Sequence, residues 1–365
     1  MTILPVPSAA AQAPFVHHGS TGAMVRLSLV NLLLNVVTLS LWRFWGKTRV
    51  RRLLWSGTDA WGDPAEYTGR GGELFLGFIV VMVAVFTPII VAMTAAQAAV
   101  MAGDVWAQGI IVALQVLIVV LAGAGLYRAR RYQLTRTVWR GIRGGQSGEA
   151  WRYGVMMIAV GLASALTLGW AWPWAEMTLA RYRMGNTTFG DARFECDARA
   201  RPLYKRFAVL WLAGLVFMAG LAVAIGGTIT YFEGMDDGSA EFLAVVVAFY
   251  VGGALWALLT IGLPLAWYRA GFLRQLAAHT RFAGISFALE ATTGSLMRLA
   301  LGNWLISILS LGVLRPWTAQ RVFRYACAHL RTSGEPDWQV VCQAPESRTR
   351  MGEGMAAVFD GAGEF

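Results

Sequence analysis

The sequence predicts an all-α polytopic membrane protein with internal repeats and a small cytoplasmic β element. Three observations support this fold class. Of the 365 residues, 56% are hydrophobic and 14% are charged, whereas about 25% of residues are charged in a typical soluble domain. Long apolar segments recur in pairs, and one short motif occurs three times between them. This composition excludes an ordinary soluble enzyme of this length.

Two pairs of apolar segments have the length of a full membrane crossing, since about 20 apolar residues span a hydrocarbon core of ~30 Å. Asp104 lies in the loop that joins the first pair, and Glu233, Asp236 and Asp237 lie in the loop of the second. The expected spans are Leu74–Ala96, Val105–Tyr127, Phe207–Tyr231 and Phe242–Tyr268.

The basic residues predict the orientation of these spans. Lys and Arg are absent between Arg70 and Arg128 and between Arg206 and Arg269, so both pairs lack basic residues. The positive-inside rule then makes the basic loops cytoplasmic. The net charge of +10 favours the lipid bilayer, and anionic phospholipid in it, as the partner. No nucleic-acid partner is expected, because the arginines flank apolar segments. The sequence neither supports nor opposes a homo-oligomer.

Three further apolar segments carry the repeated motif. In each, a Thr-Leu or Ser-Leu pair begins seven residues before a Trp, and an Arg follows that Trp by seven residues. The segments are Met24–Trp45, Trp151–Trp174 and Leu296–Trp317, and the motif begins at Thr38, Thr167 and Ser310.

These three segments admit two arrangements. If all of them crossed the membrane, the basic loops 128–150 and 176–206 would face opposite compartments, against the positive-inside rule. We therefore favour re-entrant or interfacial helical hairpins that enter and leave from the cytoplasmic side, which a membrane tolerates where protein covers the irregular backbone. Full crossing, which the lengths alone permit, is the alternative.

A break is expected inside each segment, at the repeated tripeptide. Gly169 and Gly312 permit a sharp turn, and Pro173 and Pro316 suit the first turn of a following helix. The first copy has Ser40 in place of the glycine, so a break is less strongly indicated there.

A second recurring element predicts short strands. An Arg precedes a Thr by six residues at Arg52/Thr58, Arg131/Thr137, Arg181/Thr187 and Arg274/Thr280. Runs rich in aromatic and β-branched residues follow, such as Thr188–Phe194 and Arg281–Phe287. Because the element follows both long spans and repeat segments, we expect all copies on one side, as a small cytoplasmic β layer.

The repeated pattern reads Asn-x(3)-[Asn/Ser]-x-x-[Thr/Ser]-Leu-[Ser/Gly]-x(3)-[Phe/Pro]-Trp-x(3)-[Arg/Thr]-x-x-Arg, with Asn-Thr-Thr-Phe-Gly after the second copy. It resembles the YjgN-like family over about residues 15 to 340. The second copy departs from it at Val160 and Thr178. The resemblance implies a multi-pass protein of the bacterial inner (cytoplasmic) membrane with a domain of unknown function, and it implies no catalytic residue.

The repeats predict five parts of the chain. These are a disordered N-terminus at 1–14, a first repeat unit at 15–150, a second at 151–294, a third partial repeat at 295–342 and a flexible tail at 343–365.

Two sets of aligned residues are candidate sites. Polar side chains at equivalent positions lie three residues apart, on one helix face. They are candidates for an intramembrane polar cluster, although close packing of membrane helices, in which small polar residues are common, is the favoured explanation. They are Asn35, Thr38, Ser164, Thr167, Ser307 and Ser310. The arginines that end each motif are candidate contacts for anionic lipid. They are Arg52, Arg181 and Arg324.

Catalytic and cofactor chemistry lacks support. Glu176, which follows Pro173, is interpreted as an acid in the first turn of a helix, with a proton-relay role as the alternative. The His17-His18 pair and Cys327 with His329 do not supply the three or four converging ligands of a metal site. No metal, cofactor or catalytic residue is therefore predicted.

Two functions remain after these exclusions. The first is a transporter or channel for a small solute, because duplicated bundles often bind ligands between repeats. The alternative is a non-catalytic membrane scaffold that binds anionic lipid or a protein partner through a basic cytoplasmic face. An intramembrane enzyme has the least support, because no nucleophile is paired with a base.

Overall fold

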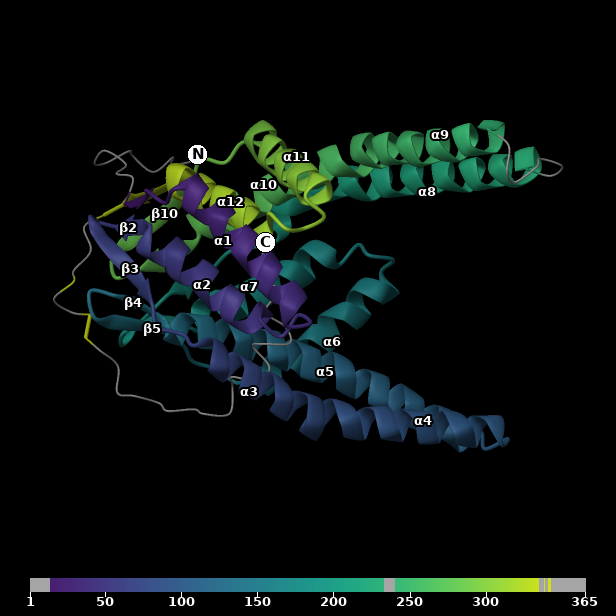
Figure 1. Ribbon diagram of the computed structural model, residues 1–365, viewed down its shortest axis with the longest axis horizontal. Helices are drawn as coiled ribbons and strands as arrows, with labels where there is room; N and C mark the ends of the chain where they lie inside the picture. Colours follow the sequence, from purple (N-terminus) through teal and green to yellow (C-terminus); the bar gives the residue numbers. More distant parts are fainter. Residues whose placement is uncertain (1–13, 233–239, 335–337, 339–340, 343–365) are drawn as a thin grey trace.

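The structure is a computed structural model that describes residues 14–232, 240–334, 338, 341 and 342. Helices dominate it, and two antiparallel sheets lie at the end from which the longest helices extend (Figure 1). The segments expected to be flexible, 1–14 and 343–365, lie outside the described residues apart from Pro14, as does the loop with Glu233, Asp236 and Asp237.

The β component is larger than the small element expected from the sequence. One sheet has seven strands in the order β1-β2-β3-β4-β5-β6-β7, and the other has four in the order β11-β10-β9-β8. The strands are β1 (Phe15–His17), β2 (Thr58–Ala60), β3 (Asp63–Tyr67), β4 (Thr137–Trp139), β5 (Ile142–Gln146), β6 (Thr187–Phe189), β7 (Ala192–Arg193), β8 (Glu195–Cys196), β9 (Thr280–Phe282), β10 (Ile285–Leu289) and β11 (Leu330–Ser333).

Three short helical segments correspond to the repeated motif, and each consists of two helices joined by a turn. They are α1 (Thr21–Val37) with α2 (Arg43–Ser56), α6 (Ala150–Leu166) with α7 (Trp172–Gly185), and α11 (Thr293–Leu309) with α12 (Arg315–His329).

Two long helical segments correspond to the pairs of expected spans. The first comprises α3 (Gly71–Val81), the π-helical turn η1 (Met82–Phe86), α4 (Thr87–Met101) and α5 (Trp106–Thr135). The second comprises the single turn η2 (Arg201–Leu203), α8 (Tyr204–Phe232), α9 (Ala240–Ala257), the π-helical turn η3 (Leu258–Gly262) and α10 (Leu263–Ala278).

Strand pairing brings together the two ends of every helical segment. The strands that flank the short segments pair with each other, as β1 with β2, β5 with β6 and β10 with β11. The strands that flank the long segments do the same, as β3 with β4 and β8 with β9. Each helical segment therefore leaves the sheets and returns to them.

Threonine marks the point where a helix gives way to a strand. Thr58, Thr137, Thr187 and Thr280 begin β2, β4, β6 and β9. Each hydroxyl donates to the carbonyl four residues earlier, at 2.7–2.9 Å, and so satisfies a carbonyl that the ending helix leaves open. The recurrence of this threonine in the sequence correctly predicted the strands.

Two-residue turns join several of these strands. Trp61-Gly62, Arg140-Gly141 and Ala283-Gly284 have positive φ at both positions. This is the geometry of a type I′ turn, whose twist matches that of the strands it joins.

The breaks expected in the three short segments are present and share one backbone conformation. Leu39, Leu168 and Leu311 have φ of 49°, 50° and 50°, and the next residues have φ of 69°, 86° and 81°. The next residue is Ser40 in the first copy and Gly in the other two, so the break forms even without the glycine.

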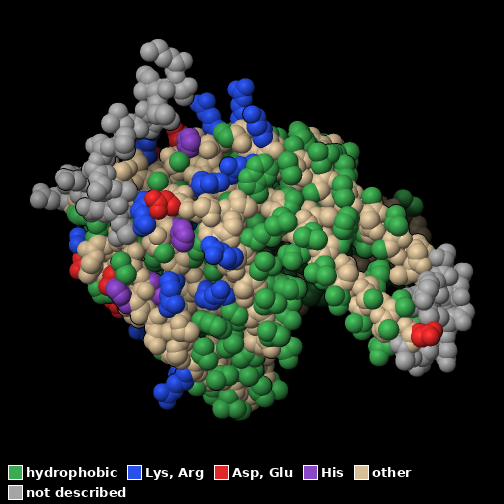
Figure 2. Space-filling view, turned by 90° about the horizontal axis from the view of Figure 1, so that it is seen from above, with side chains coloured by type: hydrophobic (Ala, Val, Ile, Leu, Met, Phe, Trp, Pro, Cys, Tyr) green, Lys and Arg blue, Asp and Glu red, His purple; other side chains and the backbone are tan. Residues whose placement is uncertain are grey.

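The expected spans coincide with helices that are long and apolar enough to cross a membrane. They are Gly71–Met101, Trp106–Thr135, Arg201–Thr228 and Glu241–Ala278. In the last two, none of the most apolar 18-residue window is buried within the chain. Figure 2 shows hydrophobic side chains over much of the surface, with Lys and Arg gathered toward the end that holds the sheets. This distribution indicates association with a membrane.

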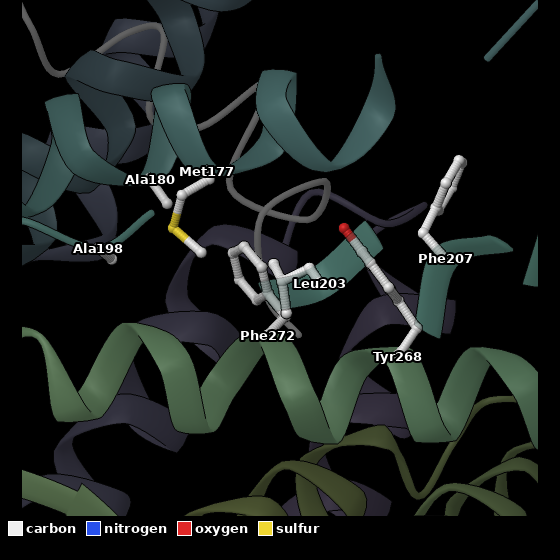
Figure 3. Packing of buried hydrophobic residues seen from close by; sticks show 7 residues of the cluster. All are labelled: Met177, Ala180, Ala198, Leu203, Phe207, Tyr268 and Phe272. Atoms are coloured by element: carbon white, nitrogen blue, oxygen red, sulfur yellow. The ribbon is translucent and has the colours of Figure 1, made fainter. Parts of the chain in front are cut away.

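Buried clusters attach the helical segments to one another. Phe44 of α2 packs with Leu74 of α3 and with Tyr132 of α5. Met177 of α7, Phe207 of α8 and Phe272 of α10 belong to one buried cluster, in which the Phe207 ring lies 5.7 Å from that of Tyr268 (Figure 3). In addition, α6 packs on α5, α11 on α10, and α12 on α1. The five segments therefore contact one another in cyclic order.

A third cluster joins the two sheets. Phe282 and Ile285 of the four-stranded sheet are buried there together with Val341, and Trp338 packs against it. The Trp338 ring lies 5.2 Å from Trp61 and 4.9 Å from Trp139, measured between ring centroids. Trp338 therefore connects the cluster to the seven-stranded sheet.

The break geometry predicts opposite effects for two reciprocal substitutions. A side chain at positive φ is strained, so Ser40→Gly should raise the stability of the protein and Gly169→Ser should lower it, each by roughly 0.5–1 kcal/mol. A Cβ at Gly169 would meet only ring atoms of Trp211, at 3.9 Å, so strain rather than a clash is tested. Thermal unfolding in detergent micelles measures both changes. Shifts of the same sign would contradict a common left-handed conformation.

Candidate functional site

A hollow with four arginines in its lining lies between α1, α2, β3 and the start of α3. It has a volume of about 950 Å³. We call it the arginine groove, and its lining comprises Ala23, Arg26, Leu27, Val30, Arg49, Arg52, Leu53, Ser56, Glu66, Tyr67, Thr68 and Arg70. A neighbouring hollow of about 470 Å³ shares Arg49, Arg52 and Arg70 with it.

Its four arginines are solvent-exposed and come from three parts of the chain. The Arg52 Nη2 atom donates to the Gly69 carbonyl at 2.8 Å, which holds this side chain against the loop before α3. The Arg49 guanidinium stacks on the Trp42 ring at 4.8 Å. Among the described residues none of the four forms an ion pair, so their charges face the groove uncompensated.

The nearby carboxylates do not neutralise the groove. Glu73, which lines the smaller hollow, accepts hydrogen bonds from Arg136 at 2.8 Å and from the Tyr132 hydroxyl at 3.0 Å. Glu66 is the one carboxylate that lines the larger hollow, against four arginines. The arginine groove therefore keeps a net positive charge, which favours an anionic ligand.

An apolar surface adjoins this positive charge. Leu27 and Val30 of α1 line the groove, and farther along the same helix Leu33, Val36 and Val37 are 65–71% exposed. Exposed apolar residues beside a cluster of arginines suit an amphiphile whose charged head and hydrocarbon chains need different surroundings.

The structure places the three predicted lipid-contact arginines in different surroundings. Arg52 lines the arginine groove. Arg324 lies on α12, which packs against α1 and α2, and its Nη2 atom donates to the Gly19 carbonyl at 3.0 Å. Arg181 is exposed on α7, which packs on α6 and β8. Their role in lipid contact stays a prediction.

Arg324 also lies near His17, on β1. Burial and then the charge of Arg324 lower the pKa of His17 below its ordinary value. The ring is therefore neutral at pH 7, and its Nδ1 atom pairs with the Thr58 hydroxyl at 2.8 Å. This contact fixes β1 to the start of β2.

Three residues of the predicted polar cluster form hydrogen bonds across the breaks of the short segments. The Thr38 hydroxyl donates to the Leu34 carbonyl at 2.6 Å and accepts from the Trp42 amide at 2.9 Å. Thr167 and Ser310 make the same pair of bonds in their own segments. Each hydroxyl thus bridges the end of one helix and the start of the next.

The other three members have less uniform surroundings. The Ser164 hydroxyl donates to the Val160 carbonyl at 2.8 Å. Asn35 has a buried side-chain oxygen without a hydrogen-bond partner, and Ser307 is half-buried. The three lie on α1, α6 and α11, which have different neighbours. A shared site for all six residues stays a prediction.

The first-turn interpretation of Glu176 is corrected by the structure. Helix α7 begins at Trp172, so Glu176 lies beyond its first turn. Its carboxylate accepts from the Tyr268 hydroxyl at 2.8 Å and pairs with Arg269. Sequence reasoning missed this link because both partners lie on α10, far along the chain.

The described residues contain no cluster of side chains that suits a metal site. No three His, Cys, Asp or Glu side chains there gather in a way that could hold a metal ion.

The arginine groove itself was not predicted, although its residues carry a sequence signal. Arg70 is the last basic residue before the first span, and Arg26 is the first basic residue of the chain. Arginines at the ends of apolar segments are ordinary orientation signals. Only the pairing of β1 with β2 and β2 with β3 brings them to the same place.

The fold and this site define a helical protein that has, among its described residues, four helices long and apolar enough to span a membrane, together with two antiparallel sheets. The chain belongs to the family of bacterial proteins of unknown function DUF898, which is the YjgN-like family, and residues 12–358 match it. No curated protein and no solved structure matches the chain.

The bridging role of the hydroxyls at the breaks predicts a specific loss of stability. Thr167→Val removes a donor and an acceptor at once and should lower the free energy of unfolding by about 1 kcal/mol. The matched control is Thr94→Val on α4, where the hydroxyl donates only to the Val91 carbonyl. Thermal unfolding of both variants in the same detergent is the measurement. Equal shifts would show that the hydroxyl at the break has no special structural role and is free for a ligand.

Proposed function

We propose that this protein is a non-catalytic membrane scaffold that binds the headgroup of an anionic phospholipid in the arginine groove. The observation that supports this function is the set of four arginines without ion-pair partners in the described residues, beside the exposed apolar face of α1. Guanidinium groups bind phosphate through paired N–H donors. The acyl chains would lie along α1.

The short helical segments fit this function as re-entrant hairpins. Both ends of each segment return to the same sheets. The leucines at their breaks, Leu39, Leu168 and Leu311, are 80–93% exposed. Apolar tips on segments that start and end at one side suit wedges that enter the membrane without crossing it. The sheets and the basic loops then belong to the cytoplasmic side of the bacterial inner membrane.

Transport of a small solute is the weaker proposal. It rests on the six polar side chains of the predicted cluster, and three of them are engaged in closing the hairpin breaks. The arginine groove, in contrast, offers charges that the described residues leave without ion-pair partners. Lipid binding therefore has the better support.

Removing charge from the arginine groove should weaken the binding of anionic lipid. The variant Arg26→Gln/Arg49→Gln/Arg70→Gln spares Arg52, which holds the loop before α3. Each arginine near anionic lipid contributes about 1 kcal/mol, so the Kd for short-chain phosphatidylglycerol should rise about 10- to 100-fold. Thermophoresis of the detergent-solubilised protein at two salt concentrations measures this, and higher salt should weaken binding to the wild type.

The control for this experiment removes the same charge elsewhere. Arg128, Arg152 and Arg193 are exposed and lie outside the arginine groove, and their replacement by Gln should leave the Kd within about twofold, because screening limits distant charges. Short-chain phosphatidylcholine controls for the apolar contribution. Equal affinity of both triple variants for phosphatidylglycerol would refute a specific headgroup site.

The re-entrant arrangement predicts the accessibility of single cysteines. After replacement of the three native cysteines, Asp104→Cys should react with a membrane-impermeant thiol reagent on intact cells. Ser56→Cys and Glu195→Cys should react only after lysis, because they follow the first two short segments and lie near the sheets. All three positions are exposed. Labelling of Glu195→Cys on intact cells would favour full crossing by the repeat segments.

A further inference from the structure

Two arginines lie close together where α5, α7 and β5 meet, and no carboxylate pairs with either. The Arg130 Nη2 atom donates to the sulfur of Met184, the residue after Arg183, at 3.4 Å. The two charges are near enough to repel each other. In the described parts of the chain neither arginine forms an ion pair, and the buried Nε atom of each has no hydrogen-bond partner.

A buried amide lies at the same junction. Gln146 ends β5, is 3% exposed, and neither its Oε1 nor its Nε2 atom has a hydrogen-bond partner of good geometry among the described residues. It pairs across the sheet with Thr187, whose hydroxyl donates to the Arg183 carbonyl at 2.8 Å. Gln146 and Arg130 are also both close to Tyr127.

Aromatic rings form one wall of this junction. Tyr127 and Tyr153 are 1% and 4% exposed, and their ring centroids lie 5.6 Å and 5.9 Å from that of Tyr182. The hydroxyls of Tyr127 and Tyr182 donate to the carbonyls of Ser147 and Glu149. The rings are therefore held in place, and these two hydroxyls donate to the backbone rather than to the guanidinium groups or to Gln146.

This arrangement is unfavourable unless something negative occupies it. Like charges at close range, together with buried donors that lack acceptors, cost free energy that a folded protein normally avoids. The hairpin fold does not require the charge, because the positions equivalent to Arg183 in the other two short segments hold Leu54 and Ala326. The two arginines therefore call for a ligand rather than for a role in the fold.

We propose that Arg130, Arg183 and Gln146 bind a phosphate-type oxyanion. Two guanidinium forks supply charge and paired donors, and the Gln146 amide supplies a neutral donor. Both arginines are half-buried, so the ligand reaches them from solvent. The oxyanion is either a free phosphate or phosphomonoester, or the phosphate of a lipid headgroup. This site lies on different elements from the arginine groove and stands whether or not that groove binds lipid.

The test compares the stability of the full-length protein with and without phosphate. The protein is purified in zwitterionic detergent without phosphate, and its thermal unfolding is followed as inorganic phosphate is added at constant ionic strength. Phosphate should raise the Tm of the wild type and of the control Arg128→Gln, an exposed arginine on the same helix. In Arg130→Gln and Arg183→Gln, the apparent Kd for phosphate should rise at least tenfold.

The phosphate-free arm distinguishes a ligand site from a structural role. Without phosphate, Arg130→Gln and Arg183→Gln should be at least as stable as the wild type, because each relieves the repulsion between the arginines. Lower stability of both variants, with an unchanged phosphate response, would overturn the proposal. So would an equal phosphate response in the wild type and both variants.

Two further measurements identify the source of the phosphate and guard against misfolded variants. Short-chain phosphatidylglycerol replaces inorganic phosphate in a second titration. A shift with the lipid alone that Arg130→Gln and Arg183→Gln abolish assigns the site to a headgroup, because lipid bound in the arginine groove would shift both variants as well. Equilibrium dialysis of the wild type with labelled inorganic phosphate should give one bound phosphate per chain, displaced by the lipid if the site is shared. No response to either compound in the wild type would refute the proposal.

Discussion

The pairing of strands across every helical segment is the constraint on which this structure depends. Because β1 pairs with β2, β3 with β4, β5 with β6, β8 with β9 and β10 with β11, each segment must finish next to where it began. A helical segment whose two ends lie side by side needs a turn at its far end. The left-handed leucines of the short segments and the loop around Asp104 in the first long one supply such turns.

The same constraint explains where binding chemistry collects. Residues at the ends of the helical segments next to the sheets come from distant parts of the chain, but they lie at one end of the molecule. Arg26, Arg52 and Arg70 line one hollow next to the sheet end of the first short segment. Arg130 interacts with Arg183 near the sheet end of the second. The long helices that extend away from the sheets expose mostly apolar residues. The charged side chains and the exposed apolar surface are thereby separated along the length of these segments.

Local patterns were sufficient to predict the elements but not their partners. Apolar length located the long spans, Gly169 and Gly312 located two breaks, and the recurring threonines located the strand starts. The break in the first short segment forms at Ser40 without a glycine, because the Thr38 hydroxyl bridges the two helices there as Thr167 and Ser310 do in the other segments. These features depend on residues close in sequence, which is why they could be read without a structure.

The sites depended on contacts that no local pattern encodes. Arginines near apolar segments are ordinary orientation signals, so nothing distinguished Arg130 or Arg49 from their neighbours until strand pairing and helix packing fixed their surroundings. The link between Glu176 and Arg269 was hidden for the same reason. The size of the β component was underestimated because strands of two to five residues carry little periodicity of their own.

The packing of Trp338 and Val341 has a consequence for the order of assembly. These residues complete the cluster that joins the two sheets, and α12 packs on α1 and β1 at the opposite end of the chain. The helical segments can form one after another as they are synthesised, but the sheets that join them lack their last components until residues 338–341 have been made. Contacts this distant in sequence also form slowly. A ribosome that stalls before these residues are made would therefore leave helical segments without a completed pair of sheets, a species with exposed strand edges that quality-control proteases and chaperones can recognise.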